Sequence, residues 1–352
     1  MAGMHPMIEA FRETAAHRLD PPFWEYVQRG CGMGISVAEA ESSWAAYRLR
    51  PRTLRDVSTV DLGLDLFGTW SNPVGVAPTA FHKLTHAEGE IATAGAAGAV
   101  GSPFVLSSRS TCRIEDVGAA VWGPWWFQVY MTLTREVTEG MVRRAVATGA
   151  TALVLTVDTP YVGHRNIPDS GRPMEMTDEL ALVNMGDHLT PQQARAPWSH
   201  IDQDPAIGVE TIEWLKQISG RPVVVKGVLR EDDARLFVDH GADAVWVSAH
   251  GGRQLDRAVT PASVLPEIVE AVGDSVPVVV DGGVRDGFDI LTALGLGASA
   301  VFVGRPALWA LASQGRPGVE SLLLEYAAEL KHVMGLAGVT DLHQIRDACL
   351  VR

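Results

Sequence analysis

The feature that most constrains the fold of this chain is a regular alternation of short β-rich runs with longer, Ala-rich runs of helical spacing. The β-rich runs cover residues 74–77, 104–106, 126–130, 152–158, 222–226, 244–248, 276–280 and 300–303. Runs that favour helix lie at 88–97, 114–119, 135–147, 209–218, 231–240, 261–272 and 287–294, with another at 319–334. Eight strands, each followed by a helix, predict a (β/α)8 TIM barrel, with a doubly wound open sheet as the alternative. Polar residues just after the strands favour the barrel, whose active sites lie at strand carboxyl ends.

The alternation also divides the chain. We expect one domain over residues 1–352, with the barrel at 73–336 and a helical extension at 1–72, where 9–17 and 23–29 have helical spacing. After the fourth strand, residues 166–206 carry Pro, Asp, Met and Gln without a clear strand. Connections of this length are usually functional or mobile, so we predict a mobile loop here.

Composition argues against several classes of partner. The 29 basic and 42 acidic residues give 29 − 42 = −13, which disfavours nucleic acid and anionic membrane surfaces. Cys31, Cys112 and Cys349 are far apart and form no C-x-x-C motif, so neither a disulfide framework nor a metal site is expected. No apolar run approaches the roughly 20 residues that span a bilayer. Without a signal-type N-terminus, we expect a cytoplasmic protein.

The sixth predicted strand is followed by SAHGGRQLD at residues 248–256. His250 and Arg253 thus lie three residues apart, separated by two glycines that let the backbone turn sharply. An arginine can hold a carboxylate with two parallel hydrogen bonds, and a histidine can take a proton from the neighbouring carbon or its hydroxyl. The pair indicates chemistry on a small acid, although an isolated H-x-x-R is more often a turn with a solvated arginine.

Other strand ends carry polar residues too. Asp158 closes the fourth strand, and since a buried acid needs a partner, His250 is the natural one. Gln128 and Tyr130 share one face of the third strand by alternation. Lys226 closes the fifth strand and must find an anion or reach solvent. Glycine-rich turns at 281–285 and 304–306, after strands seven and eight, predict a phosphate site.

These motifs, and their order along the chain, resemble those of the FMN-dependent 2-hydroxy acid oxidases and dehydrogenases. That family includes glycolate oxidase, lactate oxidase and mandelate dehydrogenase. The resemblance runs from about Tyr26 to the C-terminus, and SAHGGRQLD differs from the family's SNHGGRQLD only at Ala249. It implies FMN as the cofactor and oxidation of an (S)-2-hydroxy acid to the 2-oxo acid. It also implies a homotetramer.

The resemblance further implies a role for each matching residue. His250 would be the base, supported by Asp158, while Tyr130 orients the substrate hydroxyl and Lys226 lies near flavin N1 and O2. The substrate carboxylate would be held by Tyr26, Arg165 and Arg253. The cofactor contacts would be Pro78, Thr79, Ala80, Ser107, Gln128, Thr156, Lys226, Ser248, Asp281, Gly282, Gly283, Arg285, Gly304 and Arg305.

The substrate is the more open question. Arg109 stands where glycolate oxidase-like members have a large aromatic residue that limits the pocket. Replacing the aromatic residue by Arg109 would let the pocket admit a larger substrate, or one with a second polar group. The alternative is that Arg109 is a surface residue that points away from the pocket. With the small Ala80 and the modest Val162, Arg109 favours a bulky or aromatic, mandelate-type acid over glycolate or lactate.

Several alternatives stay open at this point. The electron acceptor is oxygen, a quinone or a partner protein, and His250 removes either the hydroxyl proton or the α-proton. An FMN barrel that does not oxidise hydroxy acids is disfavoured by the pair Arg253 and Arg165. A flavin-binding protein without catalysis is disfavoured by the intact His250, Asp158 and Tyr130.

Overall fold

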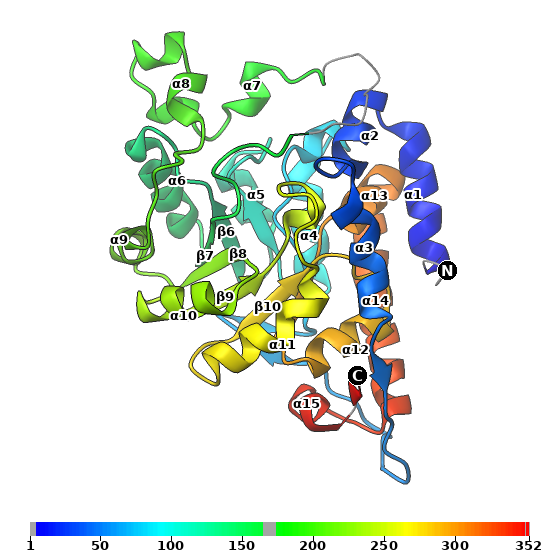
Figure 1. Cartoon of the computed structure of the whole chain (residues 1–352). Coiled ribbons are helices and arrows are strands. Elements are labelled where there is room, and N and C mark those ends of the chain that lie inside the picture. Colours follow the sequence, from blue (N-terminus) through cyan, green and yellow to red (C-terminus); the bar gives the residue numbers. More distant parts are fainter. Residues whose placement is uncertain (1–4, 165–173, 349, 352) are drawn as a thin grey trace.

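The computed structural model describes residues 5–164, 174–348, 350 and 351, and it contains the predicted barrel (Figure 1). Its eight parallel strands are β4 (Val74–Val76), β5 (Val105–Ser107), β6 (Trp125–Val129), β7 (Ala150–Thr156), β8 (Val223–Val228), β9 (Ala244–Val247), β10 (Val278–Asp281) and β11 (Ala300–Val303). They pair in the order β4-β11-β10-β9-β8-β7-β6-β5, and a parallel bridge between Val76 and Phe104 joins β4 back to β5. This closure confirms the barrel and rules out the open doubly wound sheet.

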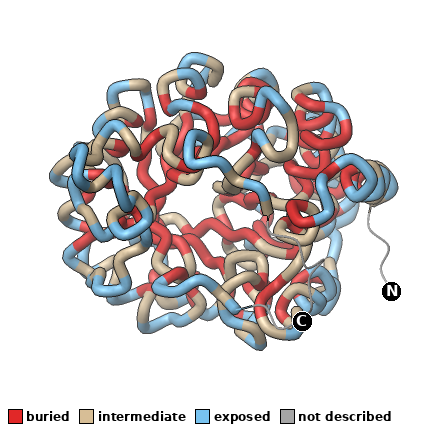
Figure 2. The backbone as a smooth tube through the Cα atoms, turned by 90° about the horizontal axis from the view of Figure 1, so that it is seen from above, coloured by how far each residue is buried: buried red, intermediate tan, exposed pale blue. Residues whose placement is uncertain are grey.

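The barrel strands are Val-rich because both of their faces are buried. Figure 2, viewed from above, shows buried strands in the middle and exposure mainly in the surrounding helices and loops. Inside the barrel, Trp126, Trp246 and Phe302 pack against one another, with ring centroids 4.2–6.4 Å apart. The hairpin of β2 (Leu64–Asp65) and β3 (Thr69–Trp70) adds Trp70 to this cluster. The interior is therefore a packed core, and only its end is open for a site.

The helices that follow the strands agree closely with the predicted runs. They are α4 (Gly89–Ala99), α5 (Ile114–Ala120), α6 (Arg135–Ala147), α9 (Glu210–Ser219), α10 (Glu231–Asp239), α11 (Pro261–Val272), α12 (Gly287–Gly295) and α14 (Arg316–Ala337). One barrel helix, α13 (Arg305–Gln314), was not predicted. Eight of its ten residues are buried, so it lacks the alternation of polar and apolar faces that marks a surface helix.

The N-terminal extension forms α1 (Pro6–Arg18), α2 (Pro21–Gln28) and α3 (Ile35–Trp44). Sequence periodicity predicted the first two helices but not α3. In Figure 1, α1 lies beside α13 and α2 lies at one end of the barrel. A second small sheet joins the segment after α3 to the C-terminal segment, where β1 (Arg48–Leu49) pairs antiparallel with β12 (Leu350–Val351). No helix in the described part of the chain has the length and apolar character to cross a membrane.

The long connection after β7 is described from residue 174 onward. It forms two short helices, α7 (Asp178–Ala181) and α8 (Trp198–Ile201), and the 3-10 turns η2 (Gly186–His188) and η3 (Gln193–Arg195). Residues 174–206, the described part of the predicted loop, contain no strand, and Gln203 alone among them forms an isolated bridge, with Thr132. Helices α7 and α8 lie at the same end of the molecule as α2 in Figure 1.

Candidate active site

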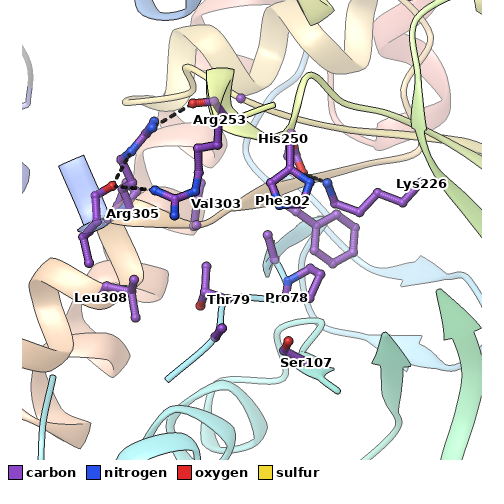
Figure 3. Close-up of a pocket in the computed structure, with 18 of the residues that line it drawn as sticks. Pro78, Thr79, Ser107, Lys226, His250, Arg253, Phe302, Val303, Arg305 and Leu308 are labelled. Carbon is purple, nitrogen blue, oxygen red and sulfur yellow. Dashed lines mark hydrogen bonds and ion pairs between the residues drawn. The ribbon is translucent and has the colours of Figure 1, made fainter. Parts of the chain in front are cut away.

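A cavity opens at the carboxyl ends of the barrel strands, as expected for this fold. Its volume, including the part open to solvent, is about 980 Å³. Pro78, Thr79 and Ser107 form one side, while Lys226, His250, Arg253 and Arg305 face them across the gap (Figure 3). In a chain with a net charge of −13, these cations make the cavity a local binding place for anions.

His250 and Asp158 form a close pair at this cavity. Nδ1 of His250 lies 2.9 Å from Oδ1 of Asp158, and their side chains are only 23% and 13% exposed. Burial opposes ionisation of Asp158, yet the neighbouring His250 and Lys226 hold the pKa of this carboxyl below its usual range. The carboxylate therefore accepts the Nδ1 proton, which leaves Nε2 of His250 as the nitrogen able to accept another proton.

The backbone turns His250 toward the cavity by a run of left-handed residues. The 3-10 turn η4 (His250–Gly252) follows β9, and φ is 53° at His250, 62° at Gly251 and 72° at Gly252. Two glycines adopt this conformation readily, whereas a histidine in it is strained, which is common at functional sites. The backbone N–H of His250 donates to the Ser248 hydroxyl at 3.0 Å and helps hold the turn.

Lys226 finds the anion that its buried position requires. Nζ of Lys226 lies 2.9 Å from Asp281 and 2.6 Å from the Ser248 hydroxyl, which in turn donates to Asp281 at 2.7 Å. The two charged side chains are 5% and 9% exposed, so the pair is nearly desolvated. Lys226 and Asp281 line the cavity, whereas Ser248 lies beneath it and links them.

Two arginines tie the cavity to the end of helix α2. Arg253 donates to the carbonyls of Tyr26, Val27 and Arg29, and its guanidinium lies 4.5 Å from the Tyr26 ring centroid. Arg305 donates to the carbonyls of Val27 at 3.0 Å and Gly251 at 2.7 Å. The last carbonyls of a helix attract cations, so α2 is anchored over the cavity. Burial, with repulsion from Arg253, lowers the pKa of Arg305 to about 9, so Arg305 stays charged at neutral pH.

The glycine-rich turns form the other end of the cavity. Gly282 and Gly283 have φ of 104° and 80°, and the Trp44 indole N–H donates to the Gly282 carbonyl at 2.9 Å. Arg285 pairs with Glu41 at 2.7 Å. Beside them, helix α13 begins just after Gly304, with its N-terminus at the cavity. Backbone N–H groups at a helix start together with two arginines suit a phosphate.

The sequence of this chain matches the family model of the FMN-dependent dehydrogenases over residues 15–352. The chain belongs to this family. Among the relatives of the chain is 2-hydroxyacid oxidase 1 of Homo sapiens, 38% identical over 98% of the chain and 96% of the relative. L-lactate oxidase of Nostoc sp. is also 38% identical, over 95% of each chain.

Solved structures of mandelate oxidase share the fold of this chain. A mandelate oxidase variant with (S)-mandelic acid superposes with a TM-score of 0.87 at 35% identity, covering 98% of each chain. Another variant, with a C4a-OH-FMN adduct, has a TM-score of 0.88 at 36% identity and covers 97% of this chain and 98% of its own. The predicted family, the flavin cofactor FMN and FMN-dependent oxidation of a 2-hydroxy acid are therefore confirmed.

The residues that line the cavity fit FMN by their own chemistry. The turn end of the cavity, with Gly282, Gly283, Arg285, Gly304 and Arg305, suits the phosphate. The backbone of 77–80 provides a small-residue wall that a flat ring system can approach, and Lys226 supplies a buried cation opposite it. A phosphate-bearing ring molecule therefore has partners at both ends of the site.

Most residues that the sequence predicted for the site line this cavity. They are Tyr26, Pro78, Thr79, Ala80, Ser107, Tyr130, Thr156, Lys226, His250, Arg253, Asp281, Gly282, Gly283, Arg285, Gly304 and Arg305. Gln128 lies beneath the lining, where it accepts from Ser107 at 3.2 Å and donates to Thr156 at 3.0 Å. Arg165 lies outside the described residues.

Val162 and Arg109, which were used to predict the substrate, are not among the residues that line the cavity. Val162 is 86% exposed and does not line the cavity, so it does not limit substrate size as expected. The strand end carries it outward, and Gly163 beside it is tied to Gln254. Arg109 is not a surface arginine pointing away, because its Nη2 donates to the Ile201 carbonyl at 2.8 Å.

Some lining residues were missed by the sequence analysis. Val27, Phe302, Val303, Pro306 and Leu308 are apolar and lie beside the predicted polar positions. Pro306 lay inside the predicted phosphate turn at 304–306 without being assigned a contact of its own, and a proline directly after Gly304-Arg305 is typical of the first turn of a helix. The others read as core residues in the sequence and line the cavity only through the strand and helix ends that carry them.

Proposed function

We propose that the chain oxidises a bulky or aromatic, mandelate-type (S)-2-hydroxy acid to its 2-oxo acid, with oxygen or another acceptor taking the electrons. The observation that carries this proposal is that His250, which lines one cavity with Arg253, has its Nδ1 2.9 Å from Oδ1 of Asp158. A base and a carboxylate clamp are what oxidation at the carbon beside a carboxylate requires. FMN, when bound, supplies the acceptor for the two electrons of this oxidation.

In this proposal the chain's own residues bind the acid and move its proton. Arg253 holds the substrate carboxylate with Tyr26, whose ring it covers. Nε2 of His250 takes the proton, and the positive charge formed on the imidazole is stabilised by Asp158. Burial raises the pKa of Tyr130, so its hydroxyl stays protonated and donates to the substrate oxygen.

The preference for a bulky acid rests on the lining of the cavity. Ala80 is small, and the side chain of Arg109 is drawn to the Ile201 carbonyl, so neither narrows the site as an aromatic residue would. Solved relatives of similar structure include mandelate oxidase with (S)-mandelic acid. A small acid such as lactate is the second candidate. L-lactate oxidase of Nostoc sp. and the human 2-hydroxyacid oxidase 1 are each 38% identical to this chain.

The test uses the purified FMN-loaded protein without oxygen. Individual 2-hydroxy acids are added while flavin absorbance is followed, and bleaching by mandelate with a higher kcat/KM than glycolate or lactate is expected. His250→Ala should keep FMN yet lose turnover by about 10²–10⁴-fold, the contribution of a positioned base. Bleaching of this variant at the parent rate would contradict the role of His250. Readmitted air then separates an oxidase, which recolours quickly and forms peroxide, from a dehydrogenase.

A further inference from the structure

Arg109 is a cation enclosed at the mouth of the barrel without an anionic partner. It follows β5, where its backbone N–H donates to Ser107 at 3.1 Å and its carbonyl accepts from Phe81 at 3.3 Å. Its side chain donates to the Ile201 carbonyl at 2.8 Å and lies 3.7 Å from the Met185 sulfur. Neither contact neutralises the charge. No carboxylate in the described part of the chain comes within ion-pair distance of Arg109, and a partly buried cation without a counter-charge loses hydration that nothing replaces.

Arg109 does not itself line the cavity, but it interacts electrostatically with Tyr26 and Tyr130, which do. Burial lowers the pKa of its guanidinium, while Tyr130, Asp202 and Tyr26 act electrostatically in the opposite direction. Tyr26 and Tyr130 both line the cavity, and the Tyr26 ring packs 5.8 Å from Phe81, whose backbone Arg109 holds. Asp202 is exposed to solvent and makes no close pair with Arg109. The cation therefore lies within electrostatic reach of the groups that would contact the substrate.

Arg109 and Arg253 come from opposite sides of the barrel. In the closed order of eight strands, β5 and β9 are separated by four positions in either direction. Both arginines act electrostatically on Tyr130, because each opposes the effect by which burial raises the Tyr130 pKa. An arginine also has five N–H donors, of which the Arg109 contacts with Ile201 and Met185 use two. Donors thus remain for a ligand.

We infer that the preferred substrate is a 2-hydroxy acid with a second anionic group at its far end, which Arg109 binds while Arg253 holds the carboxylate beside the reacting carbon. This inference rests on the proposed function and narrows its substrate class. A dianionic acid supplies the counter-charge that Arg109 lacks, and it spans the mouth between cations on opposite strands. A guanidinium paired with a carboxylate in an enclosed site gives strong discrimination against an uncharged group of the same shape.

The experiment compares two acids of nearly equal shape, (S)-4-carboxymandelate and (S)-4-methylmandelate, with the aliphatic pair (S)-2-hydroxyglutarate and (S)-2-hydroxyhexanoate. Anaerobic flavin bleaching gives kcat/KM for each acid with the FMN-loaded protein. The dianionic member of at least one pair should be preferred by the parent, and Arg109→Met should lower that preference by about 30-fold. Arg109→Lys, which keeps the positive charge but lacks the planar guanidinium, should retain part of the preference for the dianionic acid. Met185→Leu is the matched control. It removes the sulfur that Arg109 contacts but leaves the guanidinium, so the preference for the dianionic acid should be unchanged.

Binding is measured separately through the perturbation of the oxidised flavin spectrum by the matching 2-oxo acids. Arg109→Met should weaken the Kd of the dianionic oxo acid far more than that of the monoanionic one. Equal losses for both members of a pair would overturn the inference and leave Arg109 as a brace for the segment at Ile201. A parent preference for the monoanionic acid in both pairs would also overturn it. If no 2-hydroxy acid bleaches the flavin, the proposed function fails, and the paired Kd values still decide the role of Arg109.

Discussion

Nδ1 of His250 and Oδ1 of Asp158 lie 2.9 Å apart although 92 residues separate them in the chain. They follow β9 and β7, with β8 between, and both are largely buried. This contact fixes which imidazole nitrogen faces the cavity, because the carboxylate takes the Nδ1 proton. The base and its orienting acid are thus brought together by the closure of the barrel.

Asp158→Asn should therefore keep the fold and the cofactor but reduce kcat. An amide does not stabilise the positive imidazole and can favour the wrong tautomer, so a fall of about 10²–10⁴-fold is expected. Stopped-flow reduction of bound flavin by substrate measures it, and the flavin spectrum of the resting protein checks that FMN remains. A variant that reduces its flavin as fast as the parent would show that Asp158 does not support His250.

Asp158 lies so close to the backbone of residue 227 that only glycine fits there. Gly227 has φ of 108°, and a Cβ placed on it would lie 2.6 Å from Cγ of Asp158. Gly227→Ala should displace the carboxylate and lower kcat as well as Tm. Gly220→Ala is the matched control, since Gly220 has φ of 61° and nothing within 4 Å of an added Cβ. It should lose about 1 kcal/mol of stability from backbone strain alone, with kcat maintained. Equal kcat losses in the two variants would contradict a specific clash with Asp158.

Lys226 and Asp281 should be strongly coupled in stability. Lys226→Met leaves Asp281 as an unpaired buried charge, which typically costs about 3–5 kcal/mol. The double variant with Asp281→Asn removes both charges and should recover part of the loss. Denaturant unfolding of the parent, the two single variants and the double variant gives the coupling free energy. Additive losses in this cycle would show that the pair does not contribute through its charges.

Asp289 should make stability depend on pH. Burial, with repulsion from Asp286, raises the pKa of Asp289 to about 7. Between about pH 4 and pH 7 the folded state then binds a proton that the unfolded state has released, so the free energy of unfolding contributed by this group falls as pH rises through that window. Asp289→Asn keeps an acceptor for the Arg285 N–H and removes the titration.

The Tm of the Asp289→Asn variant should accordingly improve relative to the parent between pH 5 and pH 8. Asp274→Asn, at a fully exposed side chain, is the control and should show no such trend. A difference in Tm between parent and Asp289→Asn that stays constant from pH 5 to pH 8 would contradict the buried, protonated state of Asp289.

Much of this protein was determined by the sequence alone. The repeated strand and helix runs predicted the eight-stranded barrel, because a buried parallel strand and its covering helix each leave a local pattern of apolar residues. Residues near the carboxyl ends of those strands, such as Lys226 and His250, could be assigned to one cavity since parallel strands bring these ends together.

The tertiary structure alone decided which groups complete the site. The carbonyls at the end of α2 accept from Arg253 and Arg305, which lie more than 200 residues away along the chain. Arg109 faces Ile201 rather than solvent, and Trp44 supports the turn at Gly282. Helix α13, buried at eight of its ten residues, also had no amphipathic pattern to reveal it. Local periodicity reports only the face that an element buries, whereas these contacts depend on which distant backbone or side chain the closed barrel places opposite it.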